Sequence, residues 1–289
     1  MPFADLGPVR LHYQVTGHGP PLVLIPGWTL NLRLWDQMLP ALEPFHRVLR
    51  YDVRGAGRST SDSSLEFSRM ADAEDLWALL DHLNLQDVHL AGHSKGALIA
   101  FVAAMSRPGA VLSLSSIGSP GPFSRPGGEA AFQSIARAWV ERIRHTARTL
   151  GAHAAVEKLE SASLFGKVRT SVDGMRRLHG AMEGYVGADL LSDTLKRTME
   201  VPTPESQMTI PVQFVVGEED PFRPECESAH ARLPGSAMAI LKHCGHMAPL
   251  ERPGALAKAI LNHSRRPAST APDGGGEASR DSISRVDII

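Results

Sequence analysis

The chain of 289 residues is long enough for one large α/β domain or two small ones with a substantial core. Its 30 Lys and Arg against 31 Asp and Glu give a formal net charge of −1, and no block of like charge stands out, which argues against a nucleic-acid or membrane-surface binder. The two cysteines, Cys226 and Cys244, are too few for a disulfide framework and suit a reducing cytoplasm.

Strands alternating with helices are predicted over the first 117 residues. Residues 9–15 alternate apolar and polar side chains, and residues 22–25 form a short apolar run of the kind found in strands buried on both faces. The expected strands are 9–15, 22–25, 47–53, 88–91 and 111–117, and the expected helices are 32–42, 73–83 and 95–105. The alternation predicts an α/β fold with a mostly parallel central sheet and helices on both faces.

The strand pattern stops at residue 118 and resumes at residue 212. Between them, apolar residues recur at helical spacing over 132–150, 154–164 and 175–199. Strands are then expected at 212–216 and 237–241, and helices at 226–233 and 250–263. We therefore expect a core of residues 1–117 and 212–263, interrupted by a helical cap of residues 118–211. The tail, 264–289, is rich in Pro, Ser, Ala and Gly and is expected to be disordered, with its last residues fraying.

Residues 92–96 have the sequence Gly-His-Ser-Lys-Gly, which fits the pattern G-x-S-x-G. The pattern follows a buried strand and opens an apolar helix. A sharp turn at that point exposes a serine hydroxyl, and the helix N-terminus favours developing negative charge. This context predicts that Ser94 is a catalytic nucleophile. The preceding His93 is expected to pack rather than to react.

A serine nucleophile needs a base, and the base needs an orienting acid. Asp220 follows the strand 212–216, at the strand end where a doubly wound sheet places its site. Glu218 and Glu219 are rivals by type, but Pro221 and Pro224 fix the turn after Asp220. For the base, His246 follows the flexible Gly245 and precedes the last helix, and His243 is its competitor. The expected triad is Ser94, Asp220 and His246.

An oxyanion hole requires two fixed N–H donors. The backbone N–H of Lys95, directly after the nucleophile, is one. The backbone N–H of Trp28, in the loop after the strand 22–25, is the natural second donor. No Cys/His cluster has zinc spacing and no Gly-rich loop fits a phosphate or dinucleotide, so neither metal nor cofactor is expected.

These motifs together resemble the α/β-hydrolase superfamily over about residues 9–263. The matching segments, in the family's order, are 26–28, 52–59, the turn at Ser94, 217–224 and 245–253. Residues 26–31 with Trp35 look like pimeloyl-carrier-protein methyl esterases. The 52–59 loop is similar to 3-oxoadipate enol-lactonases and to cofactor-free haloperoxidases. The resemblance implies an α/β-hydrolase fold with a cap that sets specificity. Two positions depart from it: Pro26, where many relatives have His, and Lys95, whose side chain would favour an anionic substrate or lie in solvent.

The leading function is hydrolysis of a carboxylic ester, thioester or lactone of a small molecule through an acyl-enzyme. Using the same triad, the chain would alternatively hydrolyse a C–C bond or act as a lyase or acyltransferase. A ligand receptor without turnover is a further alternative. We expect a cytoplasmic enzyme whose partner is a small-molecule substrate rather than nucleic acid or a membrane. The sequence leaves the substrate and the oligomeric state open.

Overall fold

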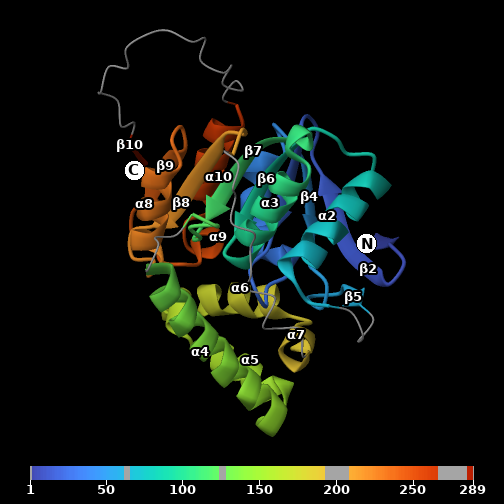
Figure 1. The fold of residues 1–289 in the computed structure, drawn as a ribbon, viewed down its shortest axis with the longest axis vertical. Coiled ribbons are helices and arrows are strands. Elements are labelled where there is room, and N and C mark those ends of the chain that lie inside the picture. Colours follow the sequence, from blue (N-terminus) through green and yellow to red (C-terminus); the bar gives the residue numbers. More distant parts are fainter. Residues whose placement is uncertain (1, 62–65, 124–127, 193–207, 266–284, 289) are drawn as a thin grey trace.

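The computed structural model describes residues 2–61, 66–123, 128–192, 208–265 and 285–288, and its centre is one twisted sheet (Figure 1). Within these residues the strands run in the order β1-β2-β4-β3-β6-β7-β8-β9-β10, with β5 paired to β2. Strands β1, β4 and β5 pair antiparallel with β2, and the neighbours from β4 to β10 pair in parallel. The sheet is thus mostly parallel, as the sequence predicts. The strands are β1 (Phe3–Asp5), β2 (Val9–Thr16), β3 (Pro21–Ile25), β4 (Arg47–Tyr51), β5 (Thr60–Ser61), β6 (Val88–His93), β7 (Val111–Ile117), β8 (Val212–Gly217), β9 (Ala237–Leu241) and β10 (Arg285–Ile288).

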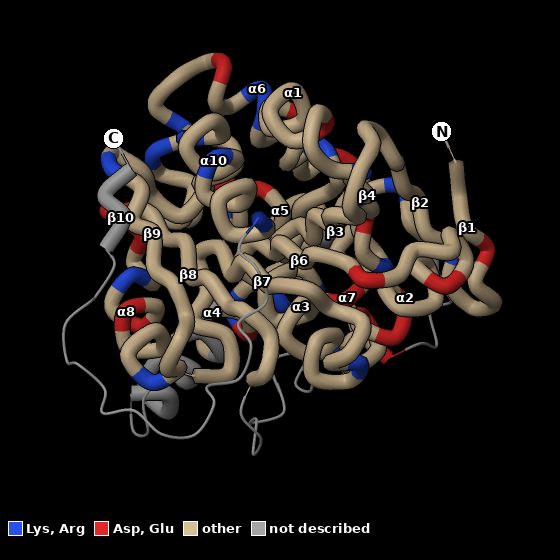
Figure 2. Tube along the Cα trace, turned by 90° about the horizontal axis from the view of Figure 1, so that it is seen from above, with Lys and Arg blue, Asp and Glu red and all other residues tan. Residues whose placement is uncertain are grey.

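Helices cover both faces of the sheet because its central strands are apolar on both sides. In β3, Leu22 and Leu24 pack into one buried cluster and Val23 and Ile25 into the other. Figure 2 shows the central strands β3, β6, β7 and β8 without charged residues, with both signs of charge interspersed outside them. The first cluster includes side chains of η1 (Leu32–Met38), α1 (Leu39–Leu42), α9 (Ala248–Glu251) and α10 (Pro253–Ser264). The second includes side chains of α2 (Arg69–His82), α3 (Lys95–Ser106) and α8 (Arg223–Arg232).

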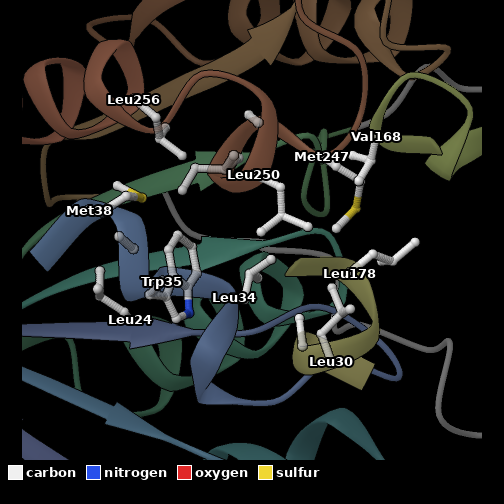
Figure 3. Close-up of a cluster of buried hydrophobic side chains, with 14 of the residues drawn as sticks. Leu24, Leu30, Leu34, Trp35, Met38, Val168, Leu178, Met247, Leu250 and Leu256 are labelled. Carbon is white, nitrogen blue, oxygen red and sulfur yellow. The ribbon is translucent and has the colours of Figure 1, made fainter. Parts of the chain in front are cut away.

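Between β7 and β8 the described helices form an insertion that lies below the strands in Figure 1, and residues 124–127 and 193–207 of the predicted cap lie outside the described residues. Its described elements are α4 (Gly128–Leu150), α5 (Ala152–Glu160), η3 (Ser163–Phe165), η4 (Val168–Thr170), α6 (Val172–Met182) and α7 (Ala188–Leu191). Figure 3 shows Val168 and Leu178 of the insertion meeting Leu30, Leu34 and Met247. One buried apolar cluster is thus shared by the sheet and the insertion.

Prolines and a glycine break three helices that the sequence predicts as continuous. Pro40 has no N–H for an α-helical bond, and residues 32–42 divide into the 3₁₀-helix η1 and the short α1. Pro253 likewise divides α9 from α10. The helix expected over 175–199 ends at Met182, and Gly184 follows with φ +83°. None of the described helices is long and apolar enough to cross a membrane.

The end of the chain differs from the expectation that it would fray. Arg285–Ile288 form β10, which pairs in parallel with β9. The outer edge of β9 offers unpaired backbone N–H and C=O groups, and an edge of that kind pairs readily with a short strand. The composition of the tail alone does not predict this pairing, because it contains no information about the open edge of β9. The remainder of the predicted disordered tail, apart from Ser264 and Arg265, lies outside the described residues.

Candidate active site

Ser94 occupies the turn between the end of β6 and the start of α3. Its φ of 51° and ψ of −113° are a backbone conformation that residues other than glycine rarely adopt. Its N–H donates to the carbonyl of Ile117 on β7 at 2.8 Å. A Cβ at Gly92 would clash with the Gly96 carbonyl, and one at Gly96 would clash with the Ile25 carbonyl. The two glycines therefore allow the helix to start directly against the strands, with Ser94 half-buried between them.

Asp220 and His246 form a buried pair. The Nδ1 atom of His246 lies 3.0 Å from one carboxylate oxygen of Asp220 and 3.2 Å from the other. Both residues are 4% exposed. The carboxylate also accepts the N–H of Phe222 at 2.9 Å, and the Phe222 ring meets the imidazole edge-on with centroids 5.0 Å apart. With Nδ1–H donating to the carboxylate, the lone pair of the imidazole is on Nε2.

The serine turn and the buried pair follow the carboxyl ends of neighbouring parallel strands: Ser94 follows β6, Asp220 follows β8 and His246 follows β9. Gly118, directly after β7, lies between them. A Cβ there would be 3.1 Å from the Asp220 carboxylate and 3.1 Å from the His246 ring, and the backbone has φ +61°. The structure therefore pairs Asp220 with His246 and bonds the Ser94 N–H to Ile117, the residue directly before Gly118. A glycine at this position leaves room for the pair beside the turn.

The rival acids and the rival base have other partners. Glu218 accepts the backbone N–H of His243 at 3.1 Å, and Glu219 forms an ion pair with Lys167. All three rivals are exposed. The hydrogen bond from the His243 backbone N–H lowers the pKa of Glu218, and the charges of His243, Arg223 and Lys242 act in the same direction. Asp220 is the acid that contacts His246.

The two predicted oxyanion donors belong to adjacent backbone segments. Lys95 is the first residue of α3, where the helix leaves its N–H groups unpaired. Trp28 lies in the turn after β3. A Cβ at the neighbouring Gly27 would lie 3.3 Å from the carbonyl oxygen of His93 and 2.7 Å from its Nδ1 atom, so this turn packs against the residue that precedes Ser94.

His93 has a contact that sequence reasoning missed. It is 1% exposed, and its Nε2 atom lies 2.9 Å from the backbone carbonyl oxygen of His246. The two imidazole rings are 4.9 Å apart. Burial lowers the pKa of His93 to about 3, and the charge of His246 acts in the same direction. His93 is therefore neutral at ordinary pH and donates to the loop of the predicted base.

The Lys95 side chain is neither in solvent nor free for an anion. Its ammonium lies 3.1 Å from the carboxylate of Asp72, which also accepts from Arg69 at 2.8 Å. Burial lowers the pKa of Lys95, and the charges of Asp72 and Asp189 oppose that shift. The ion pair forms where α2 packs against α3, a contact that the local sequence pattern does not encode.

One described group of side chains has potential metal ligands close together. Ligand atoms of Glu218, Glu219 and His243 lie within 4.8 Å of one another. All three residues are exposed, and the two glutamates bind the His243 N–H and Lys167 as described above. This group lies at the surface turn before Asp220 and contributes no contact to His246.

Sequence comparison identifies a family and its relatives. A sequence model of the family described as alpha/beta hydrolase fold matches residues 20–253. RutD of Pseudomonas savastanoi pv. phaseolicola, a relative named as a carbamate hydrolase, is 27% identical over 269 residues, which cover 88% of this chain and 96% of the relative. A pimeloyl-[acyl-carrier protein] methyl ester esterase of Photobacterium profundum is 38% identical over 117 residues. That match spans 40% of this chain and only 44% of the esterase.

Solved structures share the fold. The enol-lactonase from Burkholderia xenovorans LB400 superimposes with a TM-score of 0.69 at 22% identity, covering 91% of this chain and 99% of the lactonase. At this identity the likeness concerns the arrangement of helices and strands, including the sheet that carries Ser94, Asp220 and His246.

Proposed function

Because the chain belongs to the alpha/beta hydrolase fold family, we propose that it hydrolyses a carboxylic ester, thioester or lactone of a small molecule through a triad of Ser94, His246 and Asp220. One observation carries the proposal: the buried bond from His246 to Asp220, 3.0 Å at its shortest, beside the strained turn of Ser94. A carboxylate that orients a neutral imidazole next to a serine in a strand-to-helix turn is the arrangement that activates a hydroxyl as a nucleophile.

The reaction begins with proton transfer from Ser94 Oγ to Nε2 of His246 as Oγ attacks the carbonyl carbon. Asp220 keeps the proton of Nδ1 in place and stabilises the imidazolium that forms. The negative charge that develops on the carbonyl oxygen is held by the backbone N–H groups of Lys95 and Trp28. Collapse of this intermediate expels the leaving group, which takes the proton from Nε2, and leaves an ester on Ser94.

A water molecule then completes the cycle. His246 removes a proton from the water, whose oxygen attacks the acyl carbon, and the Ser94 oxygen leaves with the proton from Nε2. The products are the carboxylic acid and the free serine. No step needs a group beyond the substrate, water and the residues named.

The relatives' names widen the substrate class to carbamates. RutD, named as a carbamate hydrolase, matches 88% of this chain, and the esterase match supports ester hydrolysis. Carbamates are acyl compounds, so the same attack by serine applies to them. In this proposal the helical insertion is a cap over the site, and its side chains select the acyl group.

A fluorophosphonate probe tests the nucleophile, because only an activated serine reacts with it. Intact-mass analysis should give one adduct on the wild-type chain and none on Ser94→Ala. An unlabelled wild type, or an adduct that persists in Ser94→Ala, contradicts the proposal. A turnover screen of p-nitrophenyl esters of varied acyl length, lactones, thioesters and carbamates then ranks the substrates. Labelling without turnover of any of them, together with tight ligand binding, favours the receptor alternative.

A further inference from the structure

The turn that carries the proposed donor Trp28 is bound to the helical insertion. We call residues 26–31 the oxyanion turn. At its end, the backbone N–H of Asn31 donates to the carbonyl of Ala181 at 2.7 Å. The Asn31 side-chain amide donates to the carbonyls of Gly180 and Glu183, each at 2.9 Å. Asn31 is 5% exposed, so three buried or half-buried bonds join this one residue to the end of α6.

A carboxylate of the insertion holds the middle of the same turn. Trp28 Nε1 donates to Asp189 Oδ2 at 2.6 Å, and the Tyr185 hydroxyl donates to Asp189 Oδ1 at 2.7 Å. Asp189 is 6% exposed and Tyr185 8%. Burial raises the pKa of Tyr185 well above its usual range, so the hydroxyl keeps its proton and remains a donor. Asp189 thus holds the indole of Trp28.

The oxyanion turn has little internal support for its conformation. Thr29 has φ +68°, which is unfavourable for a β-branched residue, and its buried hydroxyl has no hydrogen-bond partner among the described residues. The bond from the Leu30 N–H to the Gly27 carbonyl, 3.2 Å long, is the turn's own backbone bond. A strained turn of this kind persists only where its surroundings hold it in place. Here the hydrogen bonds of Asn31 and Trp28 to the insertion hold the turn.

The other donor is held differently. Lys95 is the first residue of α3, and its side chain is anchored to Asp72 on α2, within the core. We propose that Asp189 and Asn31 are positioning residues. They hold the Trp28 N–H in the oxyanion hole, so this donor is in place only while the insertion is docked on the turn. The inference rests on the proposed function and extends it: the insertion takes part in transition-state stabilisation as well as in substrate selection.

The test compares Asp189→Leu, Trp28→Phe and the double variant with the wild type on one activated p-nitrophenyl ester. Loss of one oxyanion donor costs about 10²–10³ in kcat, and a displaced donor costs part of that. We expect kcat to fall about 10- to 100-fold in each single variant, with KM within about threefold. The double variant should lose little more than either single variant, because Asp189→Leu removes the acceptor and Trp28→Phe the donor of the same bond. Affinity for phenylboronic acid, which forms a tetrahedral adduct on serine, should fall with kcat.

Arg177→Gln is the matched control. It removes another bond between the insertion and the core, from Arg177 Nη1 to the Leu250 carbonyl at 3.3 Å, away from the oxyanion turn. We expect its kcat and boronate affinity to match those of the wild type. Hydrogen exchange of the Leu30 and Asn31 amides should accelerate in Asp189→Leu and not in Arg177→Gln, which tests the link between the insertion and the turn without any substrate.

The outcomes separate this inference from the proposed function. If wild-type kcat and Ser94 labelling are normal but the Asp189 and Trp28 variants keep full kcat, the inference is wrong and the triad stands. Equal losses in Arg177→Gln, or additive losses in the double variant, also overturn it, because the effect would then be general destabilisation. If the wild type is neither labelled at Ser94 nor active, both are wrong.

Discussion

The Nε2 atom of His93 donates a hydrogen bond to the backbone carbonyl of His246 at 2.9 Å, so the residue before the nucleophile holds the loop of the base. Because these residues come from β6 and from the loop after β9, the bond fixes the spacing between Ser94 and His246. His93→Leu removes the donor and should lower kcat about 10- to 100-fold, since small misplacements of reacting groups are costly. His93→Gln retains an N–H donor and should recover most of the loss. Steady-state kinetics with KM and kcat separated measure both.

The control for His93 lies on the same strand. His89, near the opposite end of β6, is also buried, and its Nδ1 atom lies 2.8 Å from the hydroxyl oxygen of Ser113 on β7. His89→Leu should therefore leave kcat near the wild-type value at neutral pH. Equal loss in both leucine variants would mean that His93 acts only through general stability.

The variant Asp220→Asn should show whether Asp220 is the carboxylate that orients His246. The amide would disturb the Nδ1–H tautomer of His246 and remove its charge partner, and loss of this acid in comparable triads costs on the order of 10⁴ in turnover. Glu219→Gln and Glu218→Gln should cost far less, because both side chains are exposed and face other partners. The measurement is kcat on one activated ester, with circular dichroism to verify folding. A folded Asp220→Asn enzyme with near-normal turnover would transfer the role to another carboxylate.

Acid should destabilise the fold through His89. Burial lowers the pKa of His89 to about 4, helped by the charges of His46 and His263. The unfolded chain binds this proton with a pKa near ~6.5. Between pH ~6.5 and the folded pKa of about 4, the unfolded state binds more protons than the folded state, so the free energy of unfolding falls as the pH falls. The contribution of neutral His89 to stability is therefore complete above pH ~6.5 and is lost as the pH falls to about 4. His89→Leu should flatten the dependence of the free energy of unfolding on pH in this window, as urea titrations at several pH values would detect. Parallel curves for variant and wild type would refute this role.

Leu178 should contribute strongly to docking of the insertion. It is fully buried on α6, in the cluster that it shares with Leu34 and Leu250. Leu178→Ala should lower the free energy of unfolding by about 2–5 kcal/mol. Val172, on the same helix, is 90% exposed, and Val172→Ala should change stability by less than about 0.5 kcal/mol. Urea denaturation compares the two, and similar values for both would show that the α6 contact contributes nothing.

The sequence predicts those parts of the site that depend on chain order. A buried strand, the Gly-His-Ser-Lys-Gly turn and an apolar helix are contiguous, so local pattern suffices to locate Ser94. Asp220 and His246 each follow a recognisable strand, and the carboxyl ends of parallel strands meet at one edge. Their contact distance, 3.0 Å, is a property of the folded structure alone.

Other contacts of the site cannot be predicted from the local sequence pattern. Trp28 and Asp189 are 161 residues apart in the sequence. Asn31 binds backbone carbonyl groups about 150 residues away, and because every residue type has such a carbonyl, the sequence does not mark these acceptors. The burial of Lys95 depends on how α2 packs against α3. The short strands β1 and β5 have too few residues for a periodic pattern, and β10 forms because β9 leaves an edge open.

The bonds between Asn31 and the end of α6 bear on how the substrate range of such a chain can change. One way to seek a new specificity is to exchange the whole insertion for that of a homologue. Here a foreign insertion would have to present backbone acceptors where Gly180, Ala181 and Glu183 stand and a carboxylate where Asp189 stands. Grafts that retain the segment from Gly180 to Asp189 and vary α4 and α5 should yield active chimeras more often than exchanges of the complete insertion.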